Sequence, residues 1–592
     1  MNRAHTKLES MKILLISTAY NGLTQRAHLE LAARGHEVFV ELAISDAQMS
    51  EAVALIEPDI VICPFLKTKL PEAVWRQTRS VIIHPGIVGD RGPSSLDWAI
   101  HDGEACWGVT AFEANHDFDA GDVWASEMFE LRFAPKASVY RQEVTDAAIG
   151  CILKTIASVR AGEEPTPLRL MKERVKGRLR PAMTQADRAI DWQHDSTRSV
   201  IRKIHAADSF PGVLGRLCGL EVYLYGAHEE GSHRGQAGDI IAQRDGAVCF
   251  ATADGAVWIS HLQERDARNQ RGLKLPAAQV LGKVVTLPEQ LPSTFARCKL
   301  IGSHHEIWYE ESAGVGYLHF DFHNGAMSTE QCRRLQRSFQ RATTRPTQVI
   351  ALVGGEDFHS NGIDLAAIEA AHDPVAESWR NINAINDLIL EVLTCTSHLT
   401  VSAVQGNAGA GGAVFPLACD CVAARSGRIF NPHYKTMGLR GSEYWTYLLP
   451  RRIGTAAAQR LTESCLPISA ERAVELGLVD VLIDARGAGF MLQLAAHLHD
   501  WCRATKLPGL LESKRKAIAP AAVLQRHRLD ELARMRMDFN GAAYSAARKA
   551  FVFKHVPTVT PSHLAPHRQR EAMRPVFSGT RMSIQSFEDE AA

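Results

Sequence analysis

The sequence predicts an α/β multidomain protein with a doubly wound parallel domain, a small β-barrel and a second α/β domain. Three observations lead to this prediction. Short apolar runs alternate with helical periodicity near the N-terminus, closely spaced short strands follow, and strands alternate with longer helices in the C-terminal half. At 592 residues the chain is too long for one hydrophobic core, so several domains are expected.

The first predicted domain covers residues 11–195, and its strands are short apolar runs. We expect strands at 11–17, 37–40, 59–63 and 80–83, and a helix around 25–34. In a parallel sheet of this kind, catalytic groups lie beyond the carboxyl ends of the strands. His84 follows the last of these strands directly, so it lies where a site is expected.

The rest of the chain divides into three further segments. Short strands and turns predict the β-barrel over residues 196–290. The second α/β domain is expected over 305–545, where the strand at 399–404 runs into a glycine-rich loop. Residues 546–592 contain several prolines and charges, which predict a helix followed by a loose tail.

Composition narrows the class of function. The chain has 66 basic and 66 acidic residues, so no excess charge indicates binding to nucleic acid or to a membrane surface. We find neither a signal sequence nor an apolar run of about 18 residues, so we expect a cytoplasmic protein. The 12 cysteines are scattered without metal-ligand spacing, and no metal site is predicted.

The first motif is Ile82-Ile83-His84-Pro85-Gly86, followed by Phe118-Asp119-Ala120-Gly121-Asp122. A histidine can move protons near neutral pH, and a nearby carboxylate can orient it and stabilise its charged form. His84 and Asp119 can fill those roles. The His-Pro-Gly tripeptide alone also fits a structural turn after a strand, so the prediction depends on both parts of the motif.

Together with Gly89-Asp-Arg-Gly-Pro-Ser-Ser and Trp107-Gly-Val-Thr-Ala-Phe, this motif resembles the folate-dependent formyltransferases over roughly residues 11–290. The resemblance implies a Rossmann-like catalytic domain followed by a small OB-like β-barrel. It implies that 10-formyltetrahydrofolate is the formyl donor and that His84 and Asp119 are catalytic. We assign four further residues to binding of the donor: Ile82, Arg91, Gly92 and Pro93.

Ile82 departs from the family pattern. The formyltransferases usually carry an asparagine at this position, which helps to stabilise the oxyanion. The isoleucine side chain cannot donate a hydrogen bond, and losing one such donor typically costs about 3–4 kcal/mol of transition-state stabilisation. Another donor could compensate, the acceptor could be more reactive, as a thiol would be, or this half could have lost catalysis.

The second motif joins Ser360-Asn361-Gly362-Ile363-Asp364-Leu365 to Gly406-Asn407-Ala408-Gly409-Ala410-Gly411-Gly412. Two converging backbone N–H groups can stabilise a thioester oxyanion, and glycine permits the close approach that this needs. The motif, with later segments up to Asp480, resembles the crotonase (enoyl-CoA hydratase/isomerase) superfamily. The resemblance implies coenzyme A, with the oxyanion held by Ile363 and Gly411. We assign four residues that flank Ile363 and Gly411 to CoA binding: Ser360, Asn361, Gly362 and Gly412.

The hydratase acid–base pair is absent from this pattern. Hydratases carry two glutamates, whose positions here are Val414 and His433. Valine cannot move a proton, which argues against ordinary enoyl-CoA hydration. The segment around residues 431–447 offers Tyr434 and Glu443 as a relocated acid–base pair, although these residues could instead stabilise a loop or a contact between subunits.

The two halves suggest one shared intermediate, formyl-CoA, which has neither an α-carbon nor a double bond. Loss of its formyl proton and of the thiolate gives carbon monoxide and CoA. The domain order resembles the hydrogenase maturation factor family HypX/HoxX, which implies synthesis of the CO ligand of [NiFe]-hydrogenase and hydrogenase maturation proteins as partners. Two alternatives remain: formyl transfer to another small acceptor, and a non-catalytic assembly factor.

Overall fold

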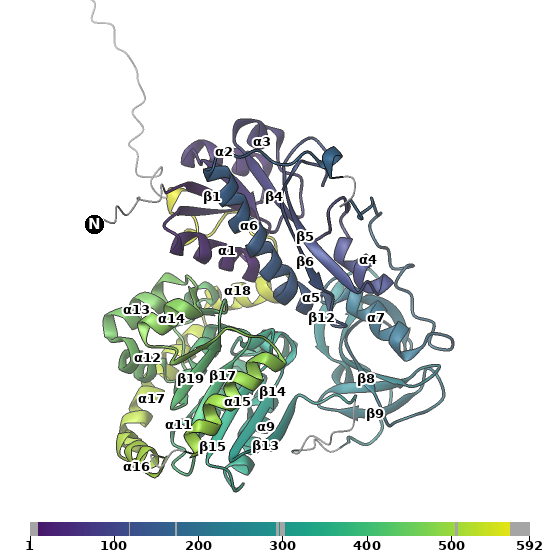
Figure 1. Ribbon diagram of the computed structural model, residues 1–592. Coiled ribbons are helices and arrows are strands. Elements are labelled where there is room, and N and C mark those ends of the chain that lie inside the picture. The colour runs from purple at the N-terminus through teal and green to yellow at the C-terminus, as the bar shows by residue number, and fades with distance from the viewer. Residues whose placement is uncertain are drawn as a thin grey trace, which may run out of the picture.

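The computed structural model describes residues 10–117, 119–171, 175–291, 295, 302–503 and 507–568. Phe118 of the first motif and residues 569–592 of the predicted tail therefore lie outside the described residues. Three domains pack against one another, coloured purple, teal and green in chain order (Figure 1). Within the described part of the chain, we find no helix that is long and apolar enough to cross a membrane.

The first domain is built on a six-stranded sheet in the order β2-β1-β3-β4-β5-β6. Its strands are β1 (Lys12–Ser17), β2 (Glu37–Leu42), β3 (Ile60–Cys63), β4 (Ser80–His84), β5 (Cys106–Glu113) and β6 (Val123–Glu130). The helical elements are α1 (Gly22–Ala33), α2 (Asp46–Ile56), α3 (Glu72–Gln77), α4 (Ser95–Asp102), α5 (Lys136–Val139), η1 (Tyr140–Val144), α6 (Thr145–Arg160) and η2 (Leu168–Leu170).

The expectation of a parallel sheet is correct for the first four strands only. β5 and β6 form an antiparallel hairpin on one edge, and β5 is antiparallel to β4. Separate apolar cores cover the two faces of this sheet. The hairpin loop carries Asp119, and the strand β4 ends at His84, so the mixed sheet supplies both members of the predicted pair.

The second domain contains a six-stranded antiparallel sheet in which β7, β8, β11, β10 and β9 follow one another and β12 also pairs with β11. The strands are β7 (Val213–Leu217), β8 (Leu220–Glu230), β9 (Ile240–Arg244), β10 (Ala247–Ala251), β11 (Ala256–Arg265) and β12 (Arg271–Pro276). Two helices, α7 (Thr197–Ala207) and α8 (Ala277–Leu281), contribute side chains to its apolar core.

The third domain has a six-stranded main sheet, with the order β13-β14-β15-β17-β19-β22, and a small sheet, β16-β18-β20-β21. The main strands are β13 (Ile307–Ser312), β14 (Val315–Phe320), β15 (Val349–Gly354), β17 (Leu399–Val404), β19 (Cys421–Arg425) and β22 (Val481–Ile483). The small sheet comprises β16 (Phe358–Ser360), β18 (Asn407–Gly409), β20 (Ile429–Asn431) and β21 (Ile468–Ser469).

Helices surround these sheets and follow them along the chain. The long helices are α9 (Thr329–Ala342), α11 (Pro374–Leu393), α12 (Trp445–Ile453), α13 (Thr455–Ser464), α15 (Ala488–Arg503), α16 (Leu507–Ala517), α17 (Ala521–Phe539) and α18 (Ala542–Val552). The shorter elements are η3 (His323–Gly325), α10 (Leu365–Ala370), η4 (Ala410–Ala413), η5 (Phe415–Ala418), η6 (Tyr434–Met437) and α14 (Ala470–Leu476).

The segment after α18 returns to the first domain, so the expectation of a loose tail is wrong up to residue 568. Glu41 on edge strand β2 is fully buried and accepts hydrogen bonds from Thr560, His567 (2.9 Å) and Arg568 (3.0 Å). Although burial raises its pKa, these hydrogen bonds outweigh burial and lower the pKa of Glu41. A buried carboxylate thus fixes the C-terminal segment on the N-terminal domain.

Candidate active sites

His84 lies between two carboxylates at the carboxyl end of β4. Its Nε2 atom is 2.9 Å from Asp90 Oδ2, and its Nδ1 atom is 3.6 Å from Asp119 Oδ1. His84 as a whole is 6% exposed. The structure therefore brings the predicted pair together, and it adds Asp90, which is closer to the ring than Asp119 and which the sequence analysis did not select.

Backbone geometry explains why the motif around His84 takes this form. A Cβ atom on Gly86 would collide with the His84 ring and with the Asp90 carboxylate, so only glycine fits there. Trp107 Nε1 donates to Pro85 O (2.9 Å), and Thr110 Oγ1 donates to Gly86 O (2.8 Å). The Trp-Gly-Val-Thr segment of β5 thus fixes the turn that carries the histidine.

Asp119 is positioned by its backbone and by the loop opposite. Its φ angle is +52°, in the left-handed region that aspartate tolerates better than most residues. Gly92 N donates to Asp119 Oδ2 at 3.2 Å. Gly92 itself has φ +118°, and a Cβ there would collide with Arg180 O. Gly92 therefore acts through its backbone.

These groups face a cavity of about 1210 Å³ that extends from the first domain to the third. Ile82, Gly92 and Pro93 line this cavity, together with His84 and Asp119. Arg91 is not among the lining residues, and its N–H donates to Arg178 O (3.2 Å) in a neighbouring segment. Three of the four residues assigned to the donor thus line the cavity of His84, and Arg91 does not.

The second site begins with the turn that follows β16. Gly362 has φ +75°, and its N–H donates to Ser360 Oγ at 3.0 Å. A Cβ on Gly362 would lie 3.4 Å from Gly411 N, so this turn and the glycine-rich loop are adjacent. Gly411 is in the first turn of η4, where N–H groups have no partner within the helix. Ser360 O leaves no room for a side chain at Gly412.

Glu443 lies directly against this loop. A Cβ on Gly411 would collide with Glu443 Oε1, so the carboxylate occupies the space that a side chain would need. Tyr434 Oη donates to Glu443 Oε2 at 3.1 Å, and Ser442 N donates to the same oxygen at 2.9 Å. Both predicted members of the relocated pair are therefore in contact with each other and next to the loop of Gly411.

Burial sets the proton affinities of this pair. Burial, with a contribution from the charge of Glu531, raises the pKa of Glu443 to about 7. Burial and the Glu443 carboxylate raise the pKa of Tyr434 well above its ordinary value, so the phenol stays protonated. Glu443 can therefore act as a base near neutral pH, while Tyr434 remains a hydrogen-bond donor.

Two residues that the sequence analysis missed support the strained turn of Glu443. Glu443 and Tyr444 have φ angles of +65° and +59°. Asn386 Oδ1 on α11 accepts from Glu443 N at 3.0 Å, and Glu531 Oε2 on α17 accepts from Tyr444 N at 2.9 Å. No local pattern marks either residue, because both are far from the turn in sequence.

The positions of the lost hydratase glutamates have other roles. Val414 is fully buried in the apolar core of the third domain. His433 Nδ1 is 2.8 Å from Asn431 O, and burial lowers the pKa of its imidazole. Across the described residues, no group of three or more His, Cys, Asp or Glu side chains is placed to hold a metal ion.

The two sites are connected by the small sheet. Phe358, Asn407 and Ile429, the first residues of β16, β18 and β20, line the cavity of His84. The other ends of these strands lead to the turn of Ile363, the loop of Gly411 and the segment of Tyr434. Each strand has three residues and spans roughly 7 Å, so the cavity wall and the second site lie at opposite ends of a short sheet.

Comparison with known proteins agrees with this division. The formyl transferase C-terminal domain family matches residues 182–275, and the enoyl-CoA hydratase/isomerase family matches residues 310–506. Methionyl-tRNA formyltransferase of Nitrosomonas eutropha is 27% identical over 230 residues, which cover 38% of this chain and 70% of that protein. The chain is thus a fusion of formyltransferase-type domains with an enoyl-CoA hydratase-type domain.

Two proteins match nearly the whole chain. Hydrogenase maturation factor HoxX of Bradyrhizobium diazoefficiens is 45% identical over 575 residues, which cover 96% of this chain and 99% of that protein. The crystal structure of HypX from Aquifex aeolicus in complex with tetrahydrofolic acid has a TM-score of 0.91 and 43% identity, and covers 95% of this chain and 99% of that one. The chain belongs to this family of hydrogenase maturation factors.

Proposed function

We propose that this chain makes carbon monoxide for hydrogenase maturation in two steps. A formyl group passes from 10-formyltetrahydrofolate to the thiol of CoA at the first site, and formyl-CoA is split into CO and CoA at the second. The observation that carries the proposal is the contact of a base, Glu443, with the loop of Gly411, where a thioester oxygen would be held. Family membership and the tetrahydrofolic acid complex of the Aquifex aeolicus protein support the folate donor.

In the first step, His84 accepts the thiol proton as sulfur attacks the formyl carbon and then returns a proton to the departing folate nitrogen. Asp90 and Asp119 flank the imidazole and stabilise its charged form. Ile82 supplies no donor to the oxyanion. A thiol acceptor fits this weaker site, because its thiolate is accessible near neutral pH.

In the second step, Glu443 takes the proton from the formyl carbon while the C–S bond breaks. The electron pair of the C–H bond stays on carbon, which leaves as CO, and the C–S pair leaves with the sulfur. The proton then passes from Glu443 to the thiolate, so CoA is regenerated and the carboxylate is ready again. Tyr434 hydrogen-bonds the carboxylate throughout.

Cations around the cavity support CoA as the acceptor, because CoA carries several phosphate charges. Lys67 and Arg141 line the cavity. Phe210, which also lines it, has Lys67 Nζ, Arg271 Cζ and Lys554 Nζ at 5.7, 5.0 and 5.6 Å from its ring centroid. Lys67 belongs to the first domain, Arg271 to the second and Lys554 to the segment after α18, so a phosphorylated ligand here could contact cations from three parts of the chain.

Carbon-13-labelled 10-formyltetrahydrofolate, CoA and the purified protein test the whole reaction, with haemoglobin to trap released CO. We expect labelled CO and tetrahydrofolate in equal amounts, and no CO when CoA is omitted. Labelled CO no higher than in a His84→Ala control would refute the proposal. Release of tetrahydrofolate that is independent of CoA would favour another acceptor. If His84→Ala and Glu443→Gln variants both supported hydrogenase maturation in cells, an assembly role would be favoured.

A further inference from the structure

A short turn of the first domain lies between the two sites. η1 (Tyr140–Val144) is a π-type turn inserted between α5 and α6, and such turns are rare and often occur at functional sites. Tyr140 and Arg141 line the cavity of His84. Gln142, the next residue, is 2% exposed and contacts the third domain instead. η1 therefore touches the first site and the third domain at once.

One set of contacts holds the start of β16. Gln142 Nε2 donates to Glu356 O at 2.7 Å and lies 3.2 Å from Asp357 Oδ1. Asp357 also accepts from Ser138 Oγ at 3.0 Å and pairs with Arg141 at 3.2 Å. Glu356 and Asp357 immediately precede β16, so contacts from the first domain hold the start of this strand.

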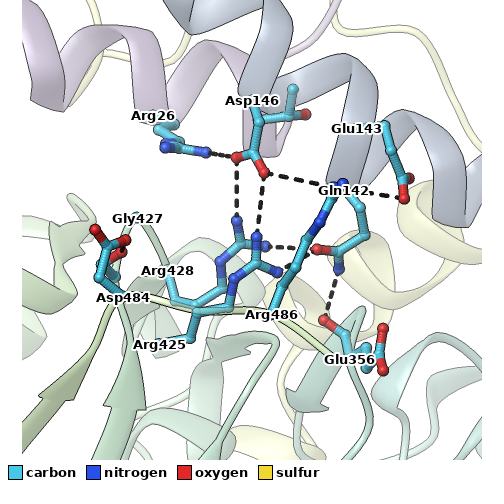
Figure 2. A network of polar contacts seen from close by, with 12 residues as sticks. Arg26, Gln142, Glu143, Asp146, Glu356, Arg425, Gly427, Arg428, Asp484 and Arg486 are labelled. Carbon is cyan, nitrogen blue, oxygen red and sulfur yellow. Dashed lines mark hydrogen bonds and ion pairs between the residues drawn. The ribbon is translucent and has the colours of Figure 1, made fainter. Parts of the chain in front are cut away.

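A second set of contacts holds the turn between β19, which ends at Arg425, and β20, which begins after Arg428. Gln142 Oε1 accepts from Arg425 Nη1 at 2.5 Å and from Arg428 Nη1 at 3.4 Å. Asp146, one turn further along α6, pairs with Arg425 at 3.1 Å and with Arg428 at 3.7 Å. Figure 2 shows the Gln142 amide between the two arginines and the Glu356 carbonyl. One side chain thus contacts the residues that precede β16 and both ends of the turn that leads from β19 into β20.

These two strands carry the reactive parts of the second site. β16 leads to the turn of Ile363 three residues after the strand ends, and β20 leads to Tyr434 after a similar distance. β18, which leads to Gly411, lies between them in the sheet. A shift at the starts of β16 and β20 would therefore move the N–H group of Ile363 and the phenol of Tyr434 relative to Glu443.

We propose that Gln142 is a positioning residue of the second site, supplied by the first domain. Its amide sets the separation of β16 and β20, and with it the geometry of Ile363, Gly411 and Tyr434. The catalytic effect rests on the proposed decarbonylation, whereas the effect on the two strands does not. η1 makes the second site dependent on the domain that delivers its substrate.

The test is a Gln142→Ala variant assayed one step at a time. With formyl-CoA supplied directly, we expect kcat for CO release to fall about tenfold and KM to stay within about twofold, because small misplacements slow chemistry more than binding. Formyl transfer at the first site should stay within about twofold. Hydrogen exchange should become faster in residues 358–363 and 429–434.

Two further variants make the result specific. Gln48→Ala is the matched control, because Gln48 also donates from the first domain to a distant segment, at Thr558 O (3.2 Å), but does not touch the small sheet. It should leave both steps and both exchange rates unchanged. Gln142→Glu keeps the acceptor for Arg425 and loses the donor to Glu356 O, so faster exchange should be confined to residues 358–363.

The outcomes separate this inference from the proposed function. Unchanged exchange in both segments of Gln142→Ala would overturn the inference, as would equal loss of both steps with a lower melting temperature, since Gln142 would then only hold the domains together. If the unaltered protein released no CO from formyl-CoA, the proposed function would fail, but the exchange data would still decide the role of Gln142.

Discussion

The first site holds its histidine at the end of a strand, with one carboxylate partner only six residues away, whereas the second holds its glutamate in a strained turn supported from two distant helices. His84 faces a large cavity, while Glu443 is buried and hydrogen-bonded to a buried tyrosine. The difference suits the proposed chemistry, in which the first site would admit two large substrates and the second would raise the basicity of a carboxylate by excluding water.

The largest expected effect is the loss of CO release when the proposed general base of the second site, Glu443, is substituted. This variant should separate the two steps. Glu443→Gln keeps the shape of the side chain and removes its ability to take a proton. We expect CO release from supplied formyl-CoA to fall about 10³-fold, within the range for loss of a general base. Tetrahydrofolate release in single-turnover assays should stay within about threefold. Equal loss of both steps would show that the sites are not separable.

His84→Ala should give the opposite pattern. Formyl transfer should fall about 10²-fold or more, since the imidazole moves both protons in that step. CO release from supplied formyl-CoA should be nearly unchanged, and this measurement also serves as the check on folding. A matched Asp90→Asn variant tests the carboxylate nearest the ring. Its formyl transfer should fall less than that of His84→Ala, and its CO release should not change.

A change of pH should alter the rate of the second step through Glu443. Because burial raises the pKa of Glu443 to about 7 and the carboxylate is the active form, CO release from formyl-CoA should rise about tenfold from pH 6 to pH 8. The nearby Glu531 charge raises this pKa further, so a Glu531→Gln variant should shift the profile to lower pH. A profile that falls with rising pH would contradict the role of Glu443.

The smallest effect on CO release is expected from Asn386, which supports the turn of Glu443. Asn386→Ala removes the acceptor of Glu443 N and leaves a buried N–H without a partner, which costs about 1–3 kcal/mol of unfolding free energy. CO release should fall several-fold, and formyl transfer should not change. Thermal melts measure the first effect and step-resolved assays the second. Loss of stability with full CO release would show that the turn tolerates movement.

The sequence predicted the parts of both sites that lie in short segments. His84 and Asp119 come from local motifs, and Tyr434 and Glu443 come from one stretch of the chain; the structure brings each pair together. Asp90 was missed although it lies in a segment used for the prediction, because Asp119 had already been assigned as the carboxylate partner of His84. The catalytic roles themselves stay predictions.

What the sequence could not predict depends on distant contacts. Asn386 and Glu531 reach the turn of Glu443 from helices that no local pattern connects to it. The antiparallel hairpin on the first sheet was missed because short apolar strands look the same in either direction. The segment after α18 was predicted to be loose because prolines and charges dominate its composition. Composition does not show that a few of its polar side chains hydrogen-bond to the buried Glu41.

The contact between Glu41 and His567 spans 526 residues, so it also orders events during protein synthesis. At roughly 5–20 residues per second, Glu41 leaves the ribosome about 25–105 s before His567. Until Thr560 emerges, shortly before His567, the carboxylate on an edge strand has none of its three later donors. A nascent chain that stops before Thr560 never acquires them, so edge strand β2 lacks the contacts of the C-terminal segment, and an uncovered edge strand can pair with another chain.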